Sequence, residues 1–247
     1  MDLLSRIEHL SIEELADCCK QEGMNCTFYS AFFRVLLLAK EQHYLPHSRT
    51  EDFRLILNKK GNNIVSHIQT LYKTNSDNLP LVCSYLLSDY KLVLINPLQE
   101  DDLGPEPDLR NNSSYIHYLR QQEYLSILDK LKQSKYAPNL QTFQHDSLTE
   151  IITENIGKKP LVGFSPEIGE YPVFPPILGH TVCLLAIAEN KLTYFDPWDG
   201  KIKVRAKEPF YKKLKSDCLF IHRPREYPHL ELHFSGSFDS QQVKTVF

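Results

Sequence analysis

The chain has 247 residues, 42% of them hydrophobic and 24% charged, which is an ordinary globular composition and excludes a disordered or fibrous protein. Its formal net charge is −3 and it has no basic stripe, so nucleic acid is not an expected partner. The longest apolar run, Val182–Ala188, is far shorter than the roughly 18 residues of a membrane span, and acidic residues interrupt the N-terminal segment. We expect no membrane insertion, and a protein that is cytoplasmic or translocated without a cleaved signal peptide.

The six cysteines and the histidine pairs give no sign of a metal site. No CxxC pair is present, so neither a zinc ribbon nor a disulfide framework is expected. Cys18 and Cys19 are adjacent in a predicted helix and cannot both face one metal. His229 and His233 lie in the alternating pattern of a strand, and no HExxH or glycine-rich nucleotide motif occurs. We therefore expect no metal and no cofactor.

The N-terminal segment is predicted to form two helices separated by a turn at Gly23. Ser11 and Glu14 have the spacing of a capping box, which begins the first helix. Asn25 is a good N-cap for the second, Cys26–Gln42. The apolar residues of this second helix recur at helical spacing and predict deep burial: Phe28, Phe32, Val35, Leu36 and Ala39.

Residues 43–157 form a mostly helical middle, which we expect to be an insert or subdomain within one domain of residues 1–247. The predicted helices are Thr50–Asn58, Asn63–Tyr72, Tyr115–Ser134 and Ser147–Asn155. Val82–Leu87 and Lys91–Ile95 fit either a strand or a buried helix. An insert of this length is large enough to recognise a partner or a substrate.

The last third changes to short strands separated by turn residues. The predicted strands are Pro160–Phe164, Thr181–Ala188, Leu192–Phe195, Lys201–Arg205 and Cys218–His222. Thr181–Ala188 is apolar on both faces, as a central strand buried on both sides would be. The basic side chains of this region indicate a solvated face: Lys201, Lys203 and Arg205. Helices first and an antiparallel meander afterwards indicate an α+β fold.

Three residues fall at positions that suit nucleophilic catalysis. Cys26 opens the buried helix, where free amides and the helix dipole favour a thiolate. His180 opens the central strand and Asp196 follows the next one, so an antiparallel hairpin brings them together, with the carboxylate orienting the imidazole. Taken singly, each residue also fits a purely structural role, as the other five cysteines do. The combination favours a catalytic site.

The order of these motifs resembles the papain-like cysteine peptidase superfamily, and most closely its bacterial C39-like branch. The resemblance covers residues 15–42 and 158–222, with Gly179-His180 and Asp196-Pro197 as its late motifs. It implies a papain-like α+β fold in which N-terminal helices, including the nucleophile helix, pack on a C-terminal antiparallel sheet. It also implies a Cys26–His180–Asp196 triad and an oxyanion hole at Gln21, with Asn25 as a second candidate donor.

The activity that this resemblance implies is hydrolysis of peptide or isopeptide bonds through an acyl thioester. Tyr171 and Phe174 in the Pro-rich loop, and Trp198 in the following turn, would contact a protein or peptide substrate. An acyltransferase or transglutaminase-like enzyme would use the same acyl-enzyme, and a catalytically inactive papain-like binding module is the alternative from a different class. The oligomeric state is not indicated by the sequence.

Overall fold

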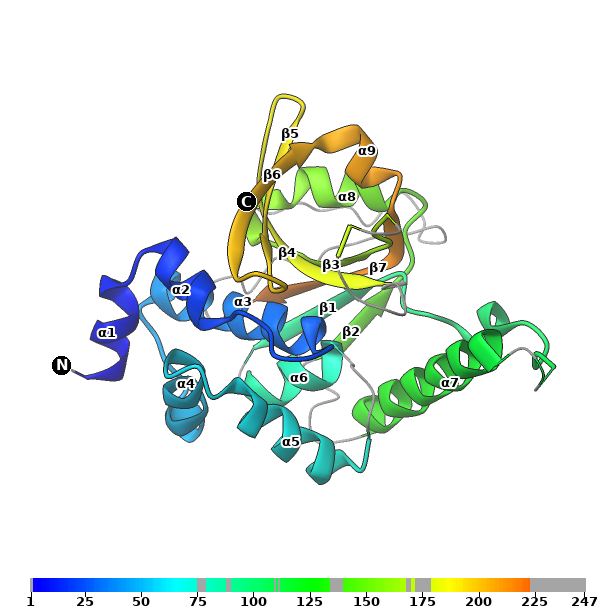
Figure 1. The fold of residues 1–247 in the computed structure, drawn as a ribbon, viewed down its shortest axis with the longest axis horizontal. Coiled ribbons are helices and arrows are strands. Elements are labelled where there is room, and N and C mark those ends of the chain that lie inside the picture. The colour runs from blue at the N-terminus through cyan, green and yellow to red at the C-terminus, as the bar shows by residue number, and fades with distance from the viewer. Residues whose placement is uncertain are drawn as a thin grey trace, which may run out of the picture.

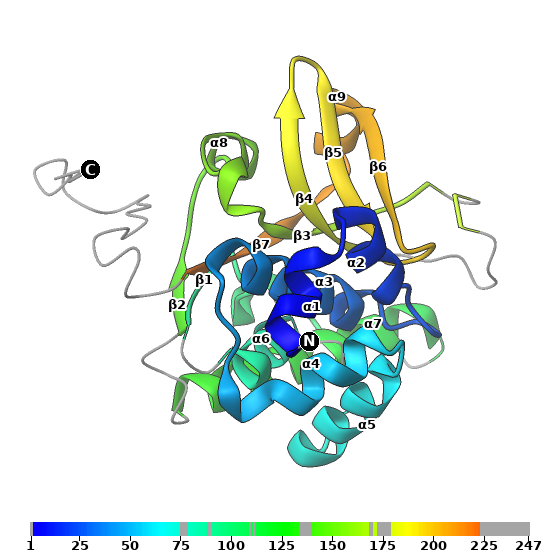
Figure 2. The same cartoon turned by 90° about the vertical axis from the view of Figure 1, so that its left-hand side faces the viewer.

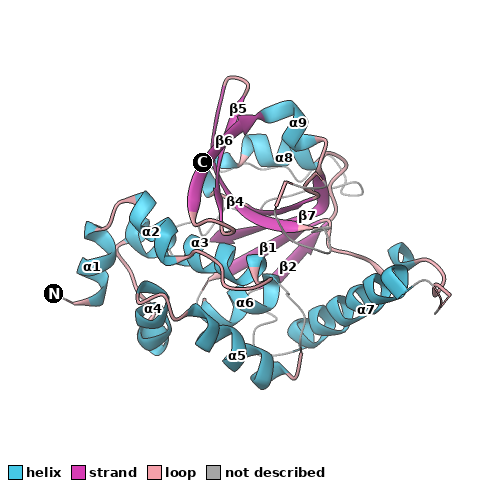
Figure 3. Ribbon diagram, viewed as in Figure 1, coloured by secondary structure: helices cyan, strands magenta, loops and turns pink. Residues whose placement is uncertain are grey.

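The computed structural model describes residues 2–74, 79–87, 90–108, 110, 112–133, 140–167, 170–171 and 179–222. The fold is α+β, with helices on both faces of one mixed sheet (Figures 1 and 3). The helices described are α1 (Leu3–His9), α2 (Ile12–Cys18), α3 (Cys26–Gln42), α4 (Thr50–Leu57), α5 (Gly61–Tyr72), α6 (Leu79–Leu86), α7 (Asn112–Gln133), α8 (Leu148–Glu154) and α9 (Lys207–Tyr211). Among these residues, no helix is long and apolar enough to cross a membrane.

The sheet has the strand order β2-β1-β7-β3-β4-β5-β6. Its strands are β1 (Lys91–Ile95), β2 (Leu140–Phe143), β3 (Leu161–Phe164), β4 (His180–Ala188), β5 (Lys191–Asp196), β6 (Lys201–Ala206) and β7 (Leu214–His222). All neighbouring pairs are antiparallel except β1 and β2, which are parallel. The C-terminal strand predictions are confirmed, with ends that differ by a few residues.

The N-terminal capping box is confirmed. The Ser11 hydroxyl accepts a 3.1 Å bond from the amide of Glu14, whose carboxylate accepts a 2.7 Å bond from the amide of Ser11. A short helix, α1, precedes it and was not predicted. The Asp2 carboxylate caps α1 by accepting a 2.8 Å bond from the amide of Ser5.

Helix α3 is the centre of the larger hydrophobic core. It has the predicted bounds and is buried around its whole circumference from Thr27 to Ala39, as a helix enclosed on all sides must be. Figure 1 shows it between the sheet and the helices α4–α6. On the sheet side, Phe33 stacks on Phe195 of β5 with ring centres 4.1 Å apart. On the helical side, a Cβ on Gly61 of α5 would lie 3.0 Å from the ring of Phe32, so a larger residue there would require the ring to shift. These contacts hold α3 between the sheet and α5.

The sheet has a second core on its other face, where α8 and α9 pack (Figure 2). In this core, side chains of the central strands that face away from α3 pack on side chains of α8 and α9. The residues are Val162, Phe164, Val182, Leu184, Ile151, Ile152 and Phe210. Strand β4 is buried from Val182 to Leu184, as predicted, but Ala186 and Ala188 are exposed because the strand continues beyond the layers that cover it. The sheet therefore separates two packed layers of helix.

Two expectations about the sheet are wrong. It is mixed and is not built from the C-terminal third alone, because β1 and β2 lie within residues 43–157. That range therefore supplies strands as well as helices and is not a purely helical insert. The two segments that fitted either a strand or a buried helix have different structures: Leu79–Leu86 is helix α6, whereas Lys91–Ile95 is strand β1. Periodicity cannot distinguish a short buried strand from a buried helical segment, and pairing with β7 decides the outcome.

Candidate active site

His180 and Asp196 meet at one end of the β4–β5 hairpin, as its antiparallel geometry predicts. His180 is the first residue of β4 and Asp196 the last of β5. The Nε2 atom of His180 lies 2.8 Å from Oδ1 of Asp196. The two side chains are fully buried, so the interaction is shielded from solvent and from salt.

The Asp196 carboxylate accepts bonds from four donors. His180 Nε2 and the backbone amide of Trp198, at 2.9 Å, contact Oδ1. The Tyr171 hydroxyl, at 2.9 Å, and Lys203 Nζ, at 2.7 Å, contact Oδ2. Burial alone would raise the pKa of this carboxyl, but the bonds and charges of His180 and Lys203 hold it well below its usual range. Asp196 is therefore a fixed anion.

The His180 ring is held by aromatic side chains on two sides. The ring of Tyr171 is tilted against it at 4.8 Å between centres, and Phe164 of β3 makes an edge contact at 5.6 Å. These contacts and the bond to Asp196 set the orientation of the imidazole. The other ring nitrogen, Nδ1, is buried and has no hydrogen-bond partner among the described residues. Buried polar nitrogens nearly always have a hydrogen-bond partner, so a nitrogen without one is unusual. Nδ1 is therefore free to bond a reacting group.

Two side chains dock the start of α3 onto the start of β4. The hydroxyl of Thr27 lies 3.1 Å from that of Thr181, and Ser30 donates a 2.7 Å bond to the Thr181 carbonyl. Because Thr27 and Thr181 directly follow Cys26 and His180, this docking brings the thiol to the imidazole. The two do not form a closed hydrogen bond in this resting geometry, in which Nδ1 is unpaired. Loosely aligned pairs of this kind are common in enzymes without substrate.

The pKa of His180 is set by its contacts with Asp196 and Cys26. Burial lowers its pKa, but the bond to Asp196, the interaction with Cys26 and the negative charges of both raise it, to about 9 overall. The ring is therefore protonated at neutral pH. A protonated imidazole beside a thiol stabilises the thiolate form of that thiol.

This pKa predicts a pH dependence of stability. We expect the free energy of unfolding to fall by up to about 3 kcal/mol as the pH rises from 6.5 to 9. Protonated His180 is favoured in the folded state, so its contribution is fully present below the ordinary pKa of 6.5 and is lost as the pH rises through about 9. Urea denaturation across this range measures the effect. The Asp196→Asn variant should show a much flatter profile, and an equally steep one would contradict the assignment.

The other cysteines differ from Cys26 in their surroundings. Cys26 is half-exposed, whereas four of the remaining cysteines are buried: Cys19, Cys83, Cys183 and Cys218. Burial raises the pKa of the Cys18, Cys19 and Cys83 thiols, and that of Cys183 to about 12. These groups stay protonated at neutral pH, so Cys26 combines access to solvent with a nearby cation.

The segment before Cys26 is docked on the turn that follows Asp196. The amide of Gln21 donates a 2.7 Å bond to the Pro197 carbonyl. Gly200 has φ +70°, and a Cβ there would lie 2.8 Å from Cβ of Lys20 and 3.2 Å from the carbonyl of Ala16. Only glycine fits both the backbone conformation and this close approach. The loop before Cys26 and the turn after Asp196 thus form one packed unit.

The candidate oxyanion donors lie in this loop. Gln21 is buried, its side-chain amide donates a 2.8 Å bond to the Gly23 carbonyl, and its Oε1 atom has no partner among the described residues. One amide hydrogen of Gln21 remains beyond that bond. Asn25 occupies the N-cap position, but its side chain does not cap α3, contrary to expectation. Its amide donates to the carbonyl of Glu22 at 3.0 Å and to Asn62 at 3.4 Å. The side chain of Asn25 therefore leaves the first-turn amides of α3 available to an anion.

The predicted substrate-contacting residues have different positions. Tyr171 is buried and bonded to Asp196, so it supports the site from behind and does not line it. Trp198 is half-buried and packs on Tyr171 at 5.2 Å between ring centres. Phe174, and the pair His229 and His233, lie outside the described residues.

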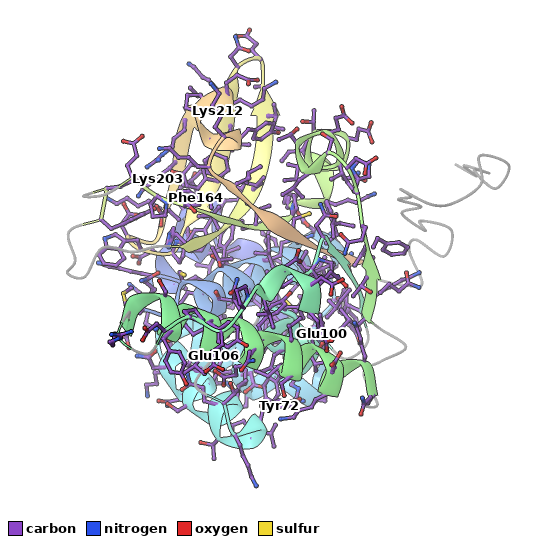
Figure 4. The ribbon with its side chains drawn as sticks, turned by 90° about the vertical axis from the view of Figure 1, so that its right-hand side faces the viewer. Tyr72, Glu100, Glu106, Phe164, Lys203 and Lys212 are labelled. Atoms are coloured by element: carbon purple, nitrogen blue, oxygen red, sulfur yellow. The ribbon has the colours of Figure 1, made fainter. Side chains whose placement is uncertain are left out.

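Lys203 is the residue of the site that the sequence did not indicate. It was predicted to belong to a solvated face, but it bonds the buried Asp196, and Arg205 on the same strand pairs with Glu170. Figure 4 shows Lys203 and Phe164 in the strand-rich part of the molecule, away from Tyr72, Glu100 and Glu106. The alternation of β6 places Lys203 and Arg205 on one face, but only tertiary packing brings that face over Asp196.

Comparisons of the chain with protein-family models, with curated proteins and with solved structures found no match. In the part of the chain that the structure describes, no group of three His, Cys, Asp or Glu side chains could hold a metal ion. The geometry of Cys26, His180 and Asp196 is therefore the feature of this chain that indicates a chemical function.

Proposed function

We propose that the protein is a papain-like cysteine hydrolase that cleaves peptide or isopeptide bonds through a thioester on Cys26. The observation that carries this proposal is the state of His180. One ring nitrogen is bonded to a buried carboxylate, and the other is buried and unpaired beside the half-exposed thiol at the start of a helix. A cysteine nucleophile, a base and a group that orients the base are the parts of a thiol hydrolase.

The chemistry follows from the two ring nitrogens. The Cys26 thiolate attacks the carbonyl carbon of the substrate, and the developing oxyanion is met by the first amides of α3 and by the remaining amide hydrogen of Gln21. Protonated His180 gives its Nδ1 proton to the leaving amine, and the C–N bond breaks to leave a thioester on Cys26. Neutral His180 then accepts a proton from water, which attacks the thioester and releases the acid. Asp196 holds the ring and its charge throughout.

The expected substrate is a protein or peptide, because a half-exposed nucleophile at the surface end of a helix can receive an extended chain. A reducing compartment keeps such a thiol active, which favours the cytoplasm or the interior of a host cell. An acyltransferase would pass through the same thioester. Adding an amine acceptor and identifying the products distinguishes transfer from hydrolysis.

The thiolate at Cys26 is tested by alkylation with iodoacetamide across a range of pH values. At about pH 6 we expect Cys26 to react at least about tenfold faster than any other cysteine, because the half-exposed Cys26 lies beside the His180 ring, whereas burial raises the pKa of the half-exposed Cys18 thiol. Peptide mass spectrometry gives the rate at each cysteine, and the urea-denatured protein gives the intrinsic rates as a control. Equal rates for Cys26 and the half-exposed Cys18 would refute the proposal.

A further inference from the structure

Lys203 reaches into the site from β6, the strand next to the His180–Asp196 hairpin. Its Nζ atom lies 2.7 Å from Oδ2 of Asp196 and 3.1 Å from Oδ2 of Asp199. The Lys203 side chain is 27% exposed, whereas that of Asp196 is fully buried. Nζ also lies 5.8 Å from the centre of the Tyr171 ring. Lys203 is thus a partly desolvated cation held by two carboxylates and an aromatic face.

Charges of opposite sign contact one another in succession at the site. The His180 imidazolium is followed by the Asp196 carboxylate, the Lys203 ammonium and the Asp199 carboxylate. Asp196 therefore lies between two cations, one on each oxygen. A buried carboxylate is strongly destabilised unless it is paired, and here it has a second cation in addition to the imidazolium.

The second cation matters because the first one loses its proton during the proposed reaction. When His180 protonates the leaving amine, the ring becomes neutral and no longer balances Asp196. Without another cation, the buried carboxylate would draw the proton back to the ring and oppose the transfer. Lys203 is bonded to the carboxylate oxygen that His180 does not contact, so it balances Asp196 in both states of His180.

We propose that Lys203 is a positioning residue that holds Asp196 ionised and aligned, and that it limits how firmly His180 keeps its proton. This inference rests on the proposed hydrolase function for its catalytic meaning, but its electrostatic content can be measured without activity. The Tyr171 hydroxyl also donates to Oδ2 of Asp196, but it is an uncharged donor. The positive charge on that oxygen is therefore supplied by Lys203.

Titratable and charged groups face this pair from every element packed on it. They are Cys26 on α3, Glu170 and Tyr171 after β3, Tyr194 and Asp196 on β5, Asp199 in the turn, and Lys203 and Arg205 on β6. Arg205 is paired with Glu170, so its charge is largely balanced. Among these groups, Lys203 is the cation bonded directly to Asp196.

The test is an NMR titration of the His180 ring in the whole protein, with a His180 variant to assign the signal. We expect Lys203→Met to raise the pKa of His180 by about one unit, because a nearby positive charge is removed. Lys203→Arg keeps the charge and should remain within a few tenths of a unit of wild type. Lys191→Met makes the same change at an exposed residue at the opposite end of the β4–β5 hairpin and should leave the titration unchanged. A Lys203→Met titration that matches wild type would overturn the inference.

A second variant keeps the test decisive if Lys203→Met does not fold. Asp199→Asn changes a side chain that is 32% exposed and removes the second carboxylate that holds Lys203. The cation then acts more fully on Asp196, and the pKa of His180 should fall by a few tenths of a unit. No fall would overturn the inference. Selective alkylation of Cys26 tests the hydrolase proposal separately, so either result can fail while the other holds.

Discussion

Replacing Cys26 by alanine is expected to lower the rate of amide hydrolysis by at least about a thousandfold. The thioester cannot form without the sulfur of Cys26. No other described cysteine is both half-exposed and next to an imidazole that is bonded to a carboxylate. The rate is measured as new amino termini released from a complex peptide mixture, which requires no known substrate. The fold should be retained because Cys26 is half-exposed and its neighbour Thr27 keeps the contact to β4.

Cys18→Ala is the matched control for this experiment. Cys18 is also half-exposed, but it lies on α2 with its thiol directed at the Leu57 carbonyl, 3.6 Å away. This variant should cleave at the wild-type rate. A Cys26→Ala protein that cleaves as fast as wild type would rule out the thioester mechanism. A wild-type protein that cleaves nothing and leaves Cys26 unlabelled would favour the inactive binding module.

Replacing Asp196 by alanine is expected to lower the free energy of unfolding by about 3–5 kcal/mol, the usual cost of removing one partner from a buried ion pair. The change leaves the His180 ring and the Tyr171 hydroxyl without a hydrogen-bond acceptor, because each of them is buried and bonded to this carboxylate. The pKa of His180 should fall well below about 9, because burial then acts against the charged ring without the opposing carboxylate. Chemical denaturation and the NMR titration measure the two effects.

Asp199→Ala is the control for Asp196→Ala. It lies in the same turn and contacts the same lysine, but its side chain is 32% exposed. Exposed pairs contribute at most about 1 kcal/mol, so this variant should be nearly as stable as wild type. If the two variants were equally stable, Asp196 would not be the buried anion around which the site is organised.

The elements with strong local patterns were predictable from the sequence. Helix α3 has its predicted bounds because its apolar residues recur at helical spacing over many turns. Strands β3 to β7 were found because turn residues separate them. The meeting of His180 and Asp196 also followed, since a short turn between antiparallel strands leaves little choice of register.

Other features depend on contacts between residues far apart in the chain. The pairing of β1 with β7, the burial of Tyr171 and the bond from Lys203 to Asp196 have no local signal. The Asn25 side chain likewise turned to Asn62 on α5, although its residue type favours capping.

The sequence by itself thus determined the buried helix that begins at Cys26, the β4–β5 hairpin and the order of Cys26, His180 and Asp196. Only the tertiary structure decided how the charges of the site are balanced. The reason is physical, because periodicity and turn chemistry act between neighbours in the chain, whereas the electrostatic environment of a buried carboxylate is set by every group packed around it. Lys203 has the sequence pattern of a surface residue, and the fold makes it the second counter-ion of Asp196.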